Sequence, residues 1–522
     1  MSSGGPDARV AGHSPSPSPA AVGALDAREI RQLRRLRRWG TTGTLLMALG
    51  STSSYGAANP IPNPVDGTRI LALLSRVGPA ALACSYSGIA LLVLSWFLLG
   101  RLAVPGRPRR LSPTQLWHTL VMWTVPLLVT PPMFSRDVYS YLAIGAMMVH
   151  GHDPYTQGPA DALGEDNPLA HQVDGRWQHT STPYGPAFLL VMKAVVLVTG
   201  DHVLRGVLLA RAVELIGVAL IVWALPRLAR RCGVDQVAVL WLGALNPLLL
   251  FHLVAGAHNE ALMIGLMLAG LVVGIERSAI AGAALIAAAV GIKVTAVLAL
   301  AFLAILLARR RGGRWPDLLA MAALLGAVAA AVFALLSWAA GYGFGWLAAL
   351  GTPGTVRSFL SVTTSLGVAG GQVGLLLGLG DATDTTVDTL HPVGTAVAAV
   401  VALVLMWRSW RARIEPMLAL GIAMGAFVLL GPVIQPWYLL WAALPLAAST
   451  SDGRYRRVTV WLTVVYAVII MPNGATIPVF AIVQSVLVAA AVAGVVLLVL
   501  ARRGMPTSRP ADEAQPAAAP QR

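Results

Sequence analysis

The sequence predicts an all-α polytopic integral membrane protein, and three observations lead to this fold class. Hydrophobic residues make up 56% of the 522-residue chain and charged residues only 12%, and the mean hydropathy is +0.70. Apolar runs recur along the chain, and a helix needs about 20 apolar residues to cross a bilayer. Clusters of arginine begin or end these runs. The pattern predicts about 12–15 transmembrane helices.

The basic charge of the chain is explained by membrane topology. The formal net charge is +15, but the arginines do not form one continuous tract. They cluster beside the apolar runs, at residues 28–38, 101–110, 227–231, 309–314, 408–413, 454–457 and 502–503. Arginine and lysine are concentrated in the cytoplasmic loops of membrane proteins. We therefore expect a multi-pass protein of the plasma membrane with both termini in the cytosol, surrounded by lipid and without a nucleic-acid partner.

These signals divide the chain into five parts. We expect a disordered, basic cytosolic tail (1–38), N-terminal transmembrane helices (39–133), an extracytoplasmic loop with interfacial or re-entrant helices (134–200), transmembrane helices with external loops (201–503) and a disordered cytosolic tail (504–522). Within the long loop, residues 138–149 are apolar enough to form a helix in the membrane interface.

The most informative motif is Ser135-Arg136-Asp137-Val138-Tyr139-Ser140-Tyr141, at the start of this loop. Three expected spans precede the motif, which places Asp137 on the external side. Asp137 and Tyr141 are four residues apart and would share one face of a helix. Ser135 and Asp137 could simply start that helix. The motif therefore permits both a capping role and a functional carboxylate at the membrane surface.

Further polar residues lie at expected external turns. His258, Asn259 and Glu260 lie between two apolar runs, where charged groups are costly and usually face a cavity. A plainer interpretation is that Asn259 and Glu260 cap the next helix.

Lys293 and Lys193 are the only lysines, and both lie in apolar segments. The ammonium group of Lys293 could neutralise a phosphate or extend to the membrane interface.

Aromatic and amide side chains are concentrated at other external segments. Gln435, Trp437 and Tyr438 belong to a segment with two prolines, which could form a sugar-stacking pocket or an ordinary aromatic belt. Tyr184 lies at the end of the long loop that Asp137 begins. Arg357 lies in an external segment, apart from the cytosolic arginine clusters, and either binds phosphate or is solvated. These residues come from distant segments but share one predicted face.

One carboxylate with several cations favours glycosyl transfer from a sugar phosphate. Glycoside hydrolysis uses two carboxylates. Phosphate is already a good leaving group, so transfer needs only positive charge and a base for the acceptor hydroxyl. We expect Asp137 to be the catalytic base. The candidate residues for binding the donor phosphate are Arg136, His258, Lys293 and Arg357. The candidates for binding the sugar or the acceptor are Tyr141, Tyr184, Asn259, Glu260, Gln435, Trp437 and Tyr438.

The Ser-Arg-Asp-Val-Tyr-Ser-Tyr string, the His-Asn-Glu turn and the string Gln-Pro-Trp-Tyr resemble a known family over residues 39–503. This family comprises the actinobacterial α-(1→6)-mannopyranosyltransferases of lipomannan and lipoarabinomannan assembly. The resemblance implies a GT-C glycosyltransferase fold with a large first extracytoplasmic catalytic loop, and Asp137 falls on the family's catalytic aspartate. It also implies a polyprenyl-phosphate mannose donor, an α-1,6-mannan glycolipid acceptor and an inverting mechanism.

The motif contains a single aspartate preceded by arginine, where metal-using relatives have Asp-X-Asp or Glu-X-Asp. We therefore expect no metal ligands, no cofactor and no essential divalent cation. The two cysteines, Cys84 and Cys232, are far apart and indicate neither a disulfide nor a metal site.

Two alternatives stay open. One is an arabinofuranosyltransferase with a polyprenyl-phosphate arabinose donor. The other is a secondary transporter, which would need charges at the membrane midplane and usually an internal repeat. No repeat is visible, and no feature of the sequence indicates a protein partner.

Overall fold

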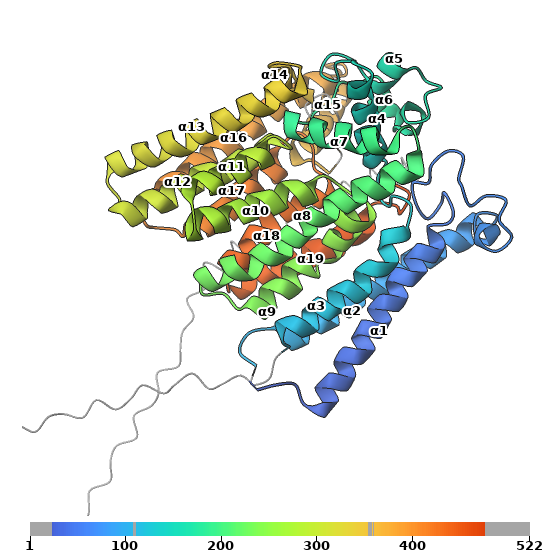
Figure 1. The fold of residues 1–522 in the computed structure, drawn as a ribbon, viewed down its shortest axis with the longest axis horizontal. Helices are drawn as coiled ribbons and strands as arrows, with labels where there is room; N and C mark the ends of the chain where they lie inside the picture. Colours follow the sequence, from blue (N-terminus) through green and yellow to red (C-terminus); the bar gives the residue numbers. More distant parts are fainter. Residues whose placement is uncertain (1–22, 108–110, 353–357, 359, 476–522) are drawn as a thin grey trace, which may run out of the picture.

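Helices provide the regular structure throughout residues 23–107, 111–352, 358 and 360–475, which the computed structural model describes (Figure 1). The first helices are α1 (Ala27–Gly50), η1 (Leu71–Leu73), α2 (Gly78–Ala103), α3 (Pro113–Thr124), η2 (Val125–Val129), α4 (Asp137–Val149), α5 (Pro159–Leu163), η3 (Ala170–Gln172), α6 (Gly175–Gln178), α7 (Pro186–Thr199) and α8 (Val203–Arg231). The central ones are α9 (Gln236–Val239), η4 (Leu240–Ala244), η5 (Leu249–Ala255), α10 (Glu260–Glu276), α11 (Ala279–Val290), η6 (Val294–Ala296), α12 (Val297–Arg311), α13 (Trp315–Ala340) and α14 (Trp346–Ala349). The last are α15 (Val362–Leu376), α16 (Thr383–Trp410), α17 (Pro416–Leu430), η8 (Pro436–Tyr438), α18 (Leu439–Ser449) and α19 (Gly453–Ile469).

Several of these helices are long and apolar enough to cross a membrane, which confirms the all-α polytopic fold class. In the described part of the chain, α2, α8, α13 and α16 meet this criterion of length and composition. The segment from α9 through η5 forms a fifth candidate, bent by 57°. Pro247 lies at this bend, and proline has no N–H to continue a helix. Other apolar runs form shorter helices, so the predicted number of 12–15 spans stays a prediction.

Helix α1 corrects the prediction of a disordered tail over residues 1–38. The side chain of Asp26 accepts a hydrogen bond from the backbone N–H of Glu29, and the Glu29 side chain accepts one from the N–H of Asp26. This capping box starts a helix through the basic cluster. Leu33 and Leu36 are buried on one face of it. Residues 27–38 are therefore helical, whereas residues 1–22 and 504–522 lie outside the described part.

Helix α4 confirms the helix expected over residues 138–149, but its environment differs from the prediction. All side chains from Val138 to Met148 are buried, and α4 packs against α7 and α8. The helix is therefore enclosed by protein instead of lying on a membrane surface. Because α4 is enclosed, its first residue, Asp137, is held at a fixed position.

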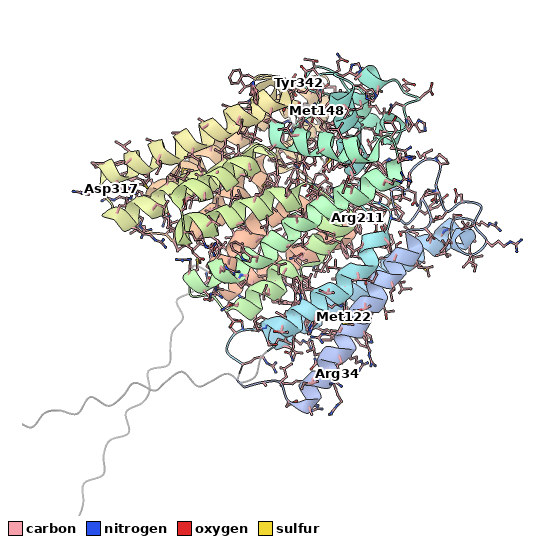
Figure 2. The ribbon with its side chains drawn as sticks, in the orientation of Figure 1. Arg34, Met122, Met148, Arg211, Asp317 and Tyr342 are labelled. Atoms are coloured by element: carbon pink, nitrogen blue, oxygen red, sulfur yellow. The ribbon has the colours of Figure 1, made fainter. Side chains whose placement is uncertain are left out.

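The basic ends of the helices lie away from the long loop. In Figure 2, Arg34 on α1 and Asp317 on α13 lie at the opposite end of the molecule from Met148 on α4 and from Tyr342. Figure 1 shows α4, α5 and α6 together at the latter end. Arg34, in the first arginine cluster, and α4, which Asp137 begins, therefore lie at opposite ends of the molecule, and the side of the membrane that each end faces stays a prediction.

Candidate active site

A cavity of about 690 Å³ lies where α4, the loop before α7, η6 and the segment before α18 meet. Segments from both halves of the chain contribute to its lining, which is partly polar and partly aromatic. The lining includes, from the residues predicted by the sequence, Arg136, Asp137, Tyr184, Lys293, Gln435, Trp437 and Tyr438. The structure therefore brings together most of the predicted polar residues around one space.

Asp137 is the first residue of α4 and lines the cavity, and its role as a functional carboxylate stays a prediction. The hydroxyl of Ser135 accepts a hydrogen bond of 2.9 Å from the backbone N–H of Asp137, but the N-cap position of α4 is Arg136, so Ser135 is not the capping residue considered from the sequence. The Asp137 side chain is 24% exposed and lines the cavity. Just before it, Phe134 has a φ of 67° and its N–H donates to the carbonyl oxygen of Pro472. The backbone on both sides of Asp137 is thus held in place.

His258 lies directly behind Asp137. Its Nε2 atom is 3.6 Å from Oδ2 of Asp137, and the side chain is fully buried. Its Nδ1 atom is 2.8 Å from the carbonyl oxygen of His252. A carbonyl oxygen only accepts hydrogen bonds, so Nδ1 carries a proton and Nε2 faces the carboxylate. The ring of Trp437 covers the imidazole, with ring centroids 3.8 Å apart.

Lys293 supplies a cation on the cavity wall. Its ammonium group forms an ion pair with the carboxylate of Glu260, whose side chain is fully buried. The Nζ atom lies 4.7 Å from the ring centroid of Tyr438 and 5.7 Å from those of Tyr184 and Trp441. Aromatic faces stabilise a cation at such distances. The lysine is therefore held by one carboxylate and three rings, and its side chain keeps an exposed fraction of 14%.

The structure places several predicted residues behind the lining. Tyr141 is buried and packs edge-to-face against Tyr184 and Phe188, with centroids 5.3 and 4.9 Å away. Asn259 and Glu260 are fully buried, and, like His258, they are not part of the lining. Direct contact of these residues with a substrate stays a prediction, whereas their packing supports residues that do line the cavity.

The guanidinium group of Arg136 joins three segments of the external region. Its Nε donates to the carbonyl oxygen of Gln172 at 2.9 Å, and its Nη1 donates to that of Asn59 at 3.1 Å. It also stacks over Tyr139, 4.8 Å from the ring centroid. Arg136 thus organises the loop while lining the cavity. Arg357, the other predicted phosphate-binding arginine, lies outside the described residues.

An ion pair at the rim was not predicted from the sequence. Nε of Arg176 lies 2.8 Å from the carboxylate of Asp174, and both residues line the cavity. Burial acts to raise the pKa of Asp174, but the hydrogen bonds from Arg176 outweigh it and hold this pKa below the ordinary value. In the sequence, the string Asp-Gly-Arg-Trp in the long loop could have indicated this ion pair. An arginine in a loop that the sequence predicts to be external is unusual under the arginine rule.

Within the described residues, no group of three or more His, Cys, Asp and Glu side chains could hold a metal ion. The lining of the cavity nevertheless provides a base and positive charge. Asp137 is placed to accept a proton, and Lys293 is placed to stabilise an anion. These are the groups that transfer of a sugar from an anionic carrier requires. Fold and cavity together place the protein in the class of integral-membrane glycosyltransferases.

Comparison with known proteins identifies the family within this class. Residues 37–309 match the model described as "Alpha-(1->6)-mannopyranosyltransferase, N-terminal domain", and residues 363–499 match the "MptB C-terminal domain". The chain belongs to the α-(1→6)-mannopyranosyltransferase family. It is thus a membrane-bound hexosyltransferase that transfers mannose, and the resemblance seen in the sequence motifs is confirmed.

Curated relatives cover most of the chain. A probable alpha-(1->6)-mannopyranosyltransferase of Mycolicibacterium smegmatis is 43% identical over 95% of this chain and 93% of its own length. An alpha-(1->6)-mannopyranosyltransferase of Mycobacterium tuberculosis is 39% identical over 82% and 81%. Alpha-(1->6)-mannopyranosyltransferase B of Corynebacterium glutamicum is 34% identical over 84% and 77%. No solved structure shows significant similarity to the chain.

Proposed function

We propose that the enzyme transfers mannose from polyprenyl-phosphate mannose to an α-1,6-mannan glycolipid on the extracytoplasmic face of the plasma membrane. In this proposal it builds the backbone of lipomannan and lipoarabinomannan, Asp137 is the general base, and the anomeric centre is inverted. Neither a cofactor nor a divalent cation is needed for turnover.

The position of Asp137 is the observation that carries the proposal. Its carboxylate is at the wall of the cavity, on the first residue of a helix whose residues 138–148 are all buried. His258 backs it, and Lys293 contributes to the same lining. A base must lie within hydrogen-bonding reach of the proton that it removes. A hydroxyl group of an acceptor sugar in the cavity could reach Asp137 directly.

The proposed reaction is a single displacement. The 6-hydroxyl oxygen of the acceptor mannose attacks the anomeric carbon of the donor, and the bond from that carbon to the phosphate oxygen breaks. The hydroxyl proton moves to the carboxylate of Asp137, and the electron pair of the broken bond stays with the polyprenyl phosphate. Attack opposite to the leaving group inverts the anomeric configuration, so an α-linked product requires a β-linked donor.

Lys293 is the best-supported residue for binding the departing phosphate. It is a cation at the cavity wall, and the aromatic rings around it exclude water on several sides. Its partner Glu260 offsets the charge in the empty cavity. A phosphate group would share the ammonium with Glu260, and positive charge at this position would stabilise the negative charge that develops in the transition state. Arg136 and Arg176 add positive charge to the lining.

The arrangement of the helices supports the external face. Arg34 of the first arginine cluster lies at the end of the molecule opposite to Met148 on α4 (Figure 2). Basic residues near the ends of spans favour the cytoplasmic side. The cavity beside α4 would then face the outside, where a sugar phosphate has to be carried by a lipid.

The test is a transfer assay with purified enzyme, radiolabelled polyprenyl-phosphate mannose and a short α-1,6-mannoside. Asp137→Asn keeps the shape of the side chain but removes the base, and we expect kcat to fall at least about 100-fold. Asp166→Asn is the matched control, since Asp166 is an exposed carboxylate of the same loop and does not line the cavity. Wild-type turnover by Asp137→Asn would disprove the assignment of the base.

Three further arms of the assay test the substrates and the metal. Transfer from polyprenyl-phosphate arabinose in place of the mannose donor would overturn the donor assignment. Solute uptake by proteoliposomes without any sugar transfer would overturn the enzymatic mechanism. Loss of turnover in excess chelator, with recovery upon addition of a divalent cation, would overturn the expectation that no metal is essential.

A further inference from the structure

Helix α8 contains two buried ionisable residues that the proposed reaction does not use. The relative exposures of Arg211 and Glu214 are 2% and 1%, and neither residue lines the cavity (Figure 2 labels Arg211). They are three residues apart, so they lie on one face of the helix. Ionisable residues inside an apolar span are costly and generally serve a function.

Arg211 binds the carboxyl end of η5. Its Nε and Nη2 atoms donate to the carbonyl oxygens of Val254 and Ala255, at 3.1 and 3.0 Å, and its Nη1 donates to that of Leu128 at 2.7 Å. The last carbonyl groups of a helix have no partner within the helix and carry partial negative charge. The guanidinium group of Arg211 donates hydrogen bonds to two of these carbonyl groups at once and links them to η2.

Glu214 binds the amino end of α10. Its Oε2 atom accepts a hydrogen bond of 3.0 Å from the backbone N–H of Leu262, in the first turn of α10. N–H groups in this turn have no partner within the helix and carry partial positive charge. Arg211 and Glu214 therefore bind the two helix ends that flank the turn of residues 256–259, which contains His258.

The turn needs this external support because its backbone is strained. Ala257 has a φ of 52°, in the left-handed region that residues with a side chain seldom adopt. Only a few hydrogen bonds from its own backbone hold it, including His258 N–H to the carbonyl oxygen of His252 at 3.2 Å. Without α8, both helix ends could shift and the imidazole would move with them.

The same contacts extend to the segment that leads into Asp137. The carbonyl oxygen of Ala255 accepts from Arg211 and also from the backbone N–H of Met133, at 3.3 Å. Arg211 thus binds a carbonyl group that directly precedes the His258 turn and that also accepts a hydrogen bond from the segment before Asp137. α8 and α10 pack closely, since a Cβ atom at Gly217 would lie 2.2 Å from the backbone of Ala261. This close packing keeps Arg211 and Glu214 within hydrogen-bonding distance of the two helix ends.

We propose that Arg211 and Glu214 are positioning residues for the transfer reaction. They fix both ends of the turn of residues 256–259 and thereby set the separation of His258 from Asp137. This inference rests on the proposed role of Asp137 as the base. It predicts that loss of either contact slows the chemical step and leaves substrate binding largely intact.

Steady-state kinetics of the full-length enzyme test the proposal. Glu214→Leu removes the acceptor at nearly constant volume, whereas Glu214→Gln keeps an amide oxygen that can accept from Leu262. We expect kcat of Glu214→Leu to fall at least about tenfold, KM for both substrates to stay within about twofold, and Glu214→Gln to recover most of the loss. The control is Arg205→Met, an exposed arginine on the same helix.

Substitutions of Arg211 provide an independent test of the proposal. Arg211→Met removes all three hydrogen bonds, and Arg211→Lys keeps the charge but cannot reach three carbonyl groups at once. We expect kcat to fall about tenfold in Arg211→Lys and further in Arg211→Met. If Arg211→Met does not give monodisperse protein by size-exclusion chromatography, Arg211→Lys alone decides this test.

Each outcome has a defined meaning when kcat is expressed per monodisperse molecule. Wild-type kcat in Glu214→Leu or Arg211→Lys would overturn the positioning role. The same conclusion follows if Glu214→Gln is as slow as Glu214→Leu, or if KM alone changes. Full activity of Asp137→Asn would instead overturn the proposed function itself. An inactive Asp137→Asn combined with a fully active Glu214→Leu would overturn only the positioning role.

Discussion

Two non-helical segments contribute to the site, and they are held in place by different chemistry. The turn before α10 is fully buried and is fixed by hydrogen bonds from the guanidinium group of Arg211 and to the carboxyl group of Glu214. The segment before η8, residues 431–435, is only partly buried and is fixed by neutral hydroxyl groups. The hydroxyls of Ser361 and Ser358 donate to the carbonyl oxygens of Gly431 and Ile434, both at 2.8 Å.

The sequences of the two segments explain this difference. The 431–435 segment follows α17 with Gly431-Pro432 and leads into Pro436, so its carbonyl groups have no helical partners and need donors from elsewhere. Each neutral hydrogen bond contributes only about 1 kcal/mol. Hydrogen bonds from a charged group, such as the guanidinium group of Arg211, contribute about 1.5–3 kcal/mol each. The turn beside Asp137 is therefore held more rigidly than the segment beside Gln435.

The largest effect is expected at Lys293, where the two segments meet. Lys293→Met leaves the buried carboxylate of Glu260 without its cation, and we expect a loss of about 3–5 kcal/mol in stability. The double variant Lys293→Met/Glu260→Leu removes both charges and should recover most of the thermal stability without recovering transfer. The measurements are thermal midpoints in detergent and turnover. An unchanged midpoint in the single variant would contradict the importance of the ion pair.

A smaller effect is expected at Trp437, which lies in η8 directly after the second segment and packs on His258. Trp437→Leu removes the ring contact, which is worth about 0.5–1.5 kcal/mol beyond buried area. If the imidazole loses its position, kcat should fall about 2- to 12-fold. Trp437→Phe keeps an aromatic ring, and its kcat should lie between those of the wild type and Trp437→Leu. A change in KM without any change in kcat would mean that Trp437 acts on substrate binding alone.

Substitution of one hydroxyl group in the second segment should have a modest effect. Ser361→Ala removes the hydrogen bond to the carbonyl oxygen of Gly431, and Thr363 still donates to the same oxygen at 3.2 Å. We expect a loss of about 1 kcal/mol in stability and a KM change without a large change in kcat. Thr389→Ala, an exposed position on α16, is the control. A tenfold loss of kcat would remove the distinction between the two segments.

The smallest effect is expected at the surface pair of His179 and Asp161, whose side chains are 2.7 Å apart. The hydrogen bond that His179 donates to the carboxylate of Asp161 raises the pKa of His179 above 6.5 and lowers the pKa of Asp161 below 3.8. Any stabilisation is therefore fully present between pH 3.8 and 6.5. It is lost as the pH rises through the raised pKa of His179, or falls through the lowered pKa of Asp161.

His179→Gln should accordingly leave the pH dependence of transfer unchanged, because the pair is exposed and does not line the cavity. The measurement is turnover of wild type and variant from pH 5 to 9, together with thermal midpoints. A shifted pH profile of kcat would show that this pair influences the reacting groups.

The sequence identified the residues of the cavity better than it assigned their partners. Asp137, Lys293 and Trp437 were recognised because polar or aromatic groups at the ends of apolar runs are conspicuous. Lys293 and Glu260 were given separate binding roles, yet they form an ion pair across 33 positions of the chain. Residue spacing within one helix reveals contacts three or four positions apart, but it contains no information about contacts between helices.

The sequence by itself determined the fold class, the family and the segments that meet at the site. These follow from local properties, since lipid requires apolar helices and short strings identify relatives. Only the tertiary structure decided that Tyr141 and Asn259 lie behind the lining, and that Arg211 and Glu214 hold the turn beside Asp137. Such placements depend on how distant helices pack, and close packing is determined by all the side chains of the interface together.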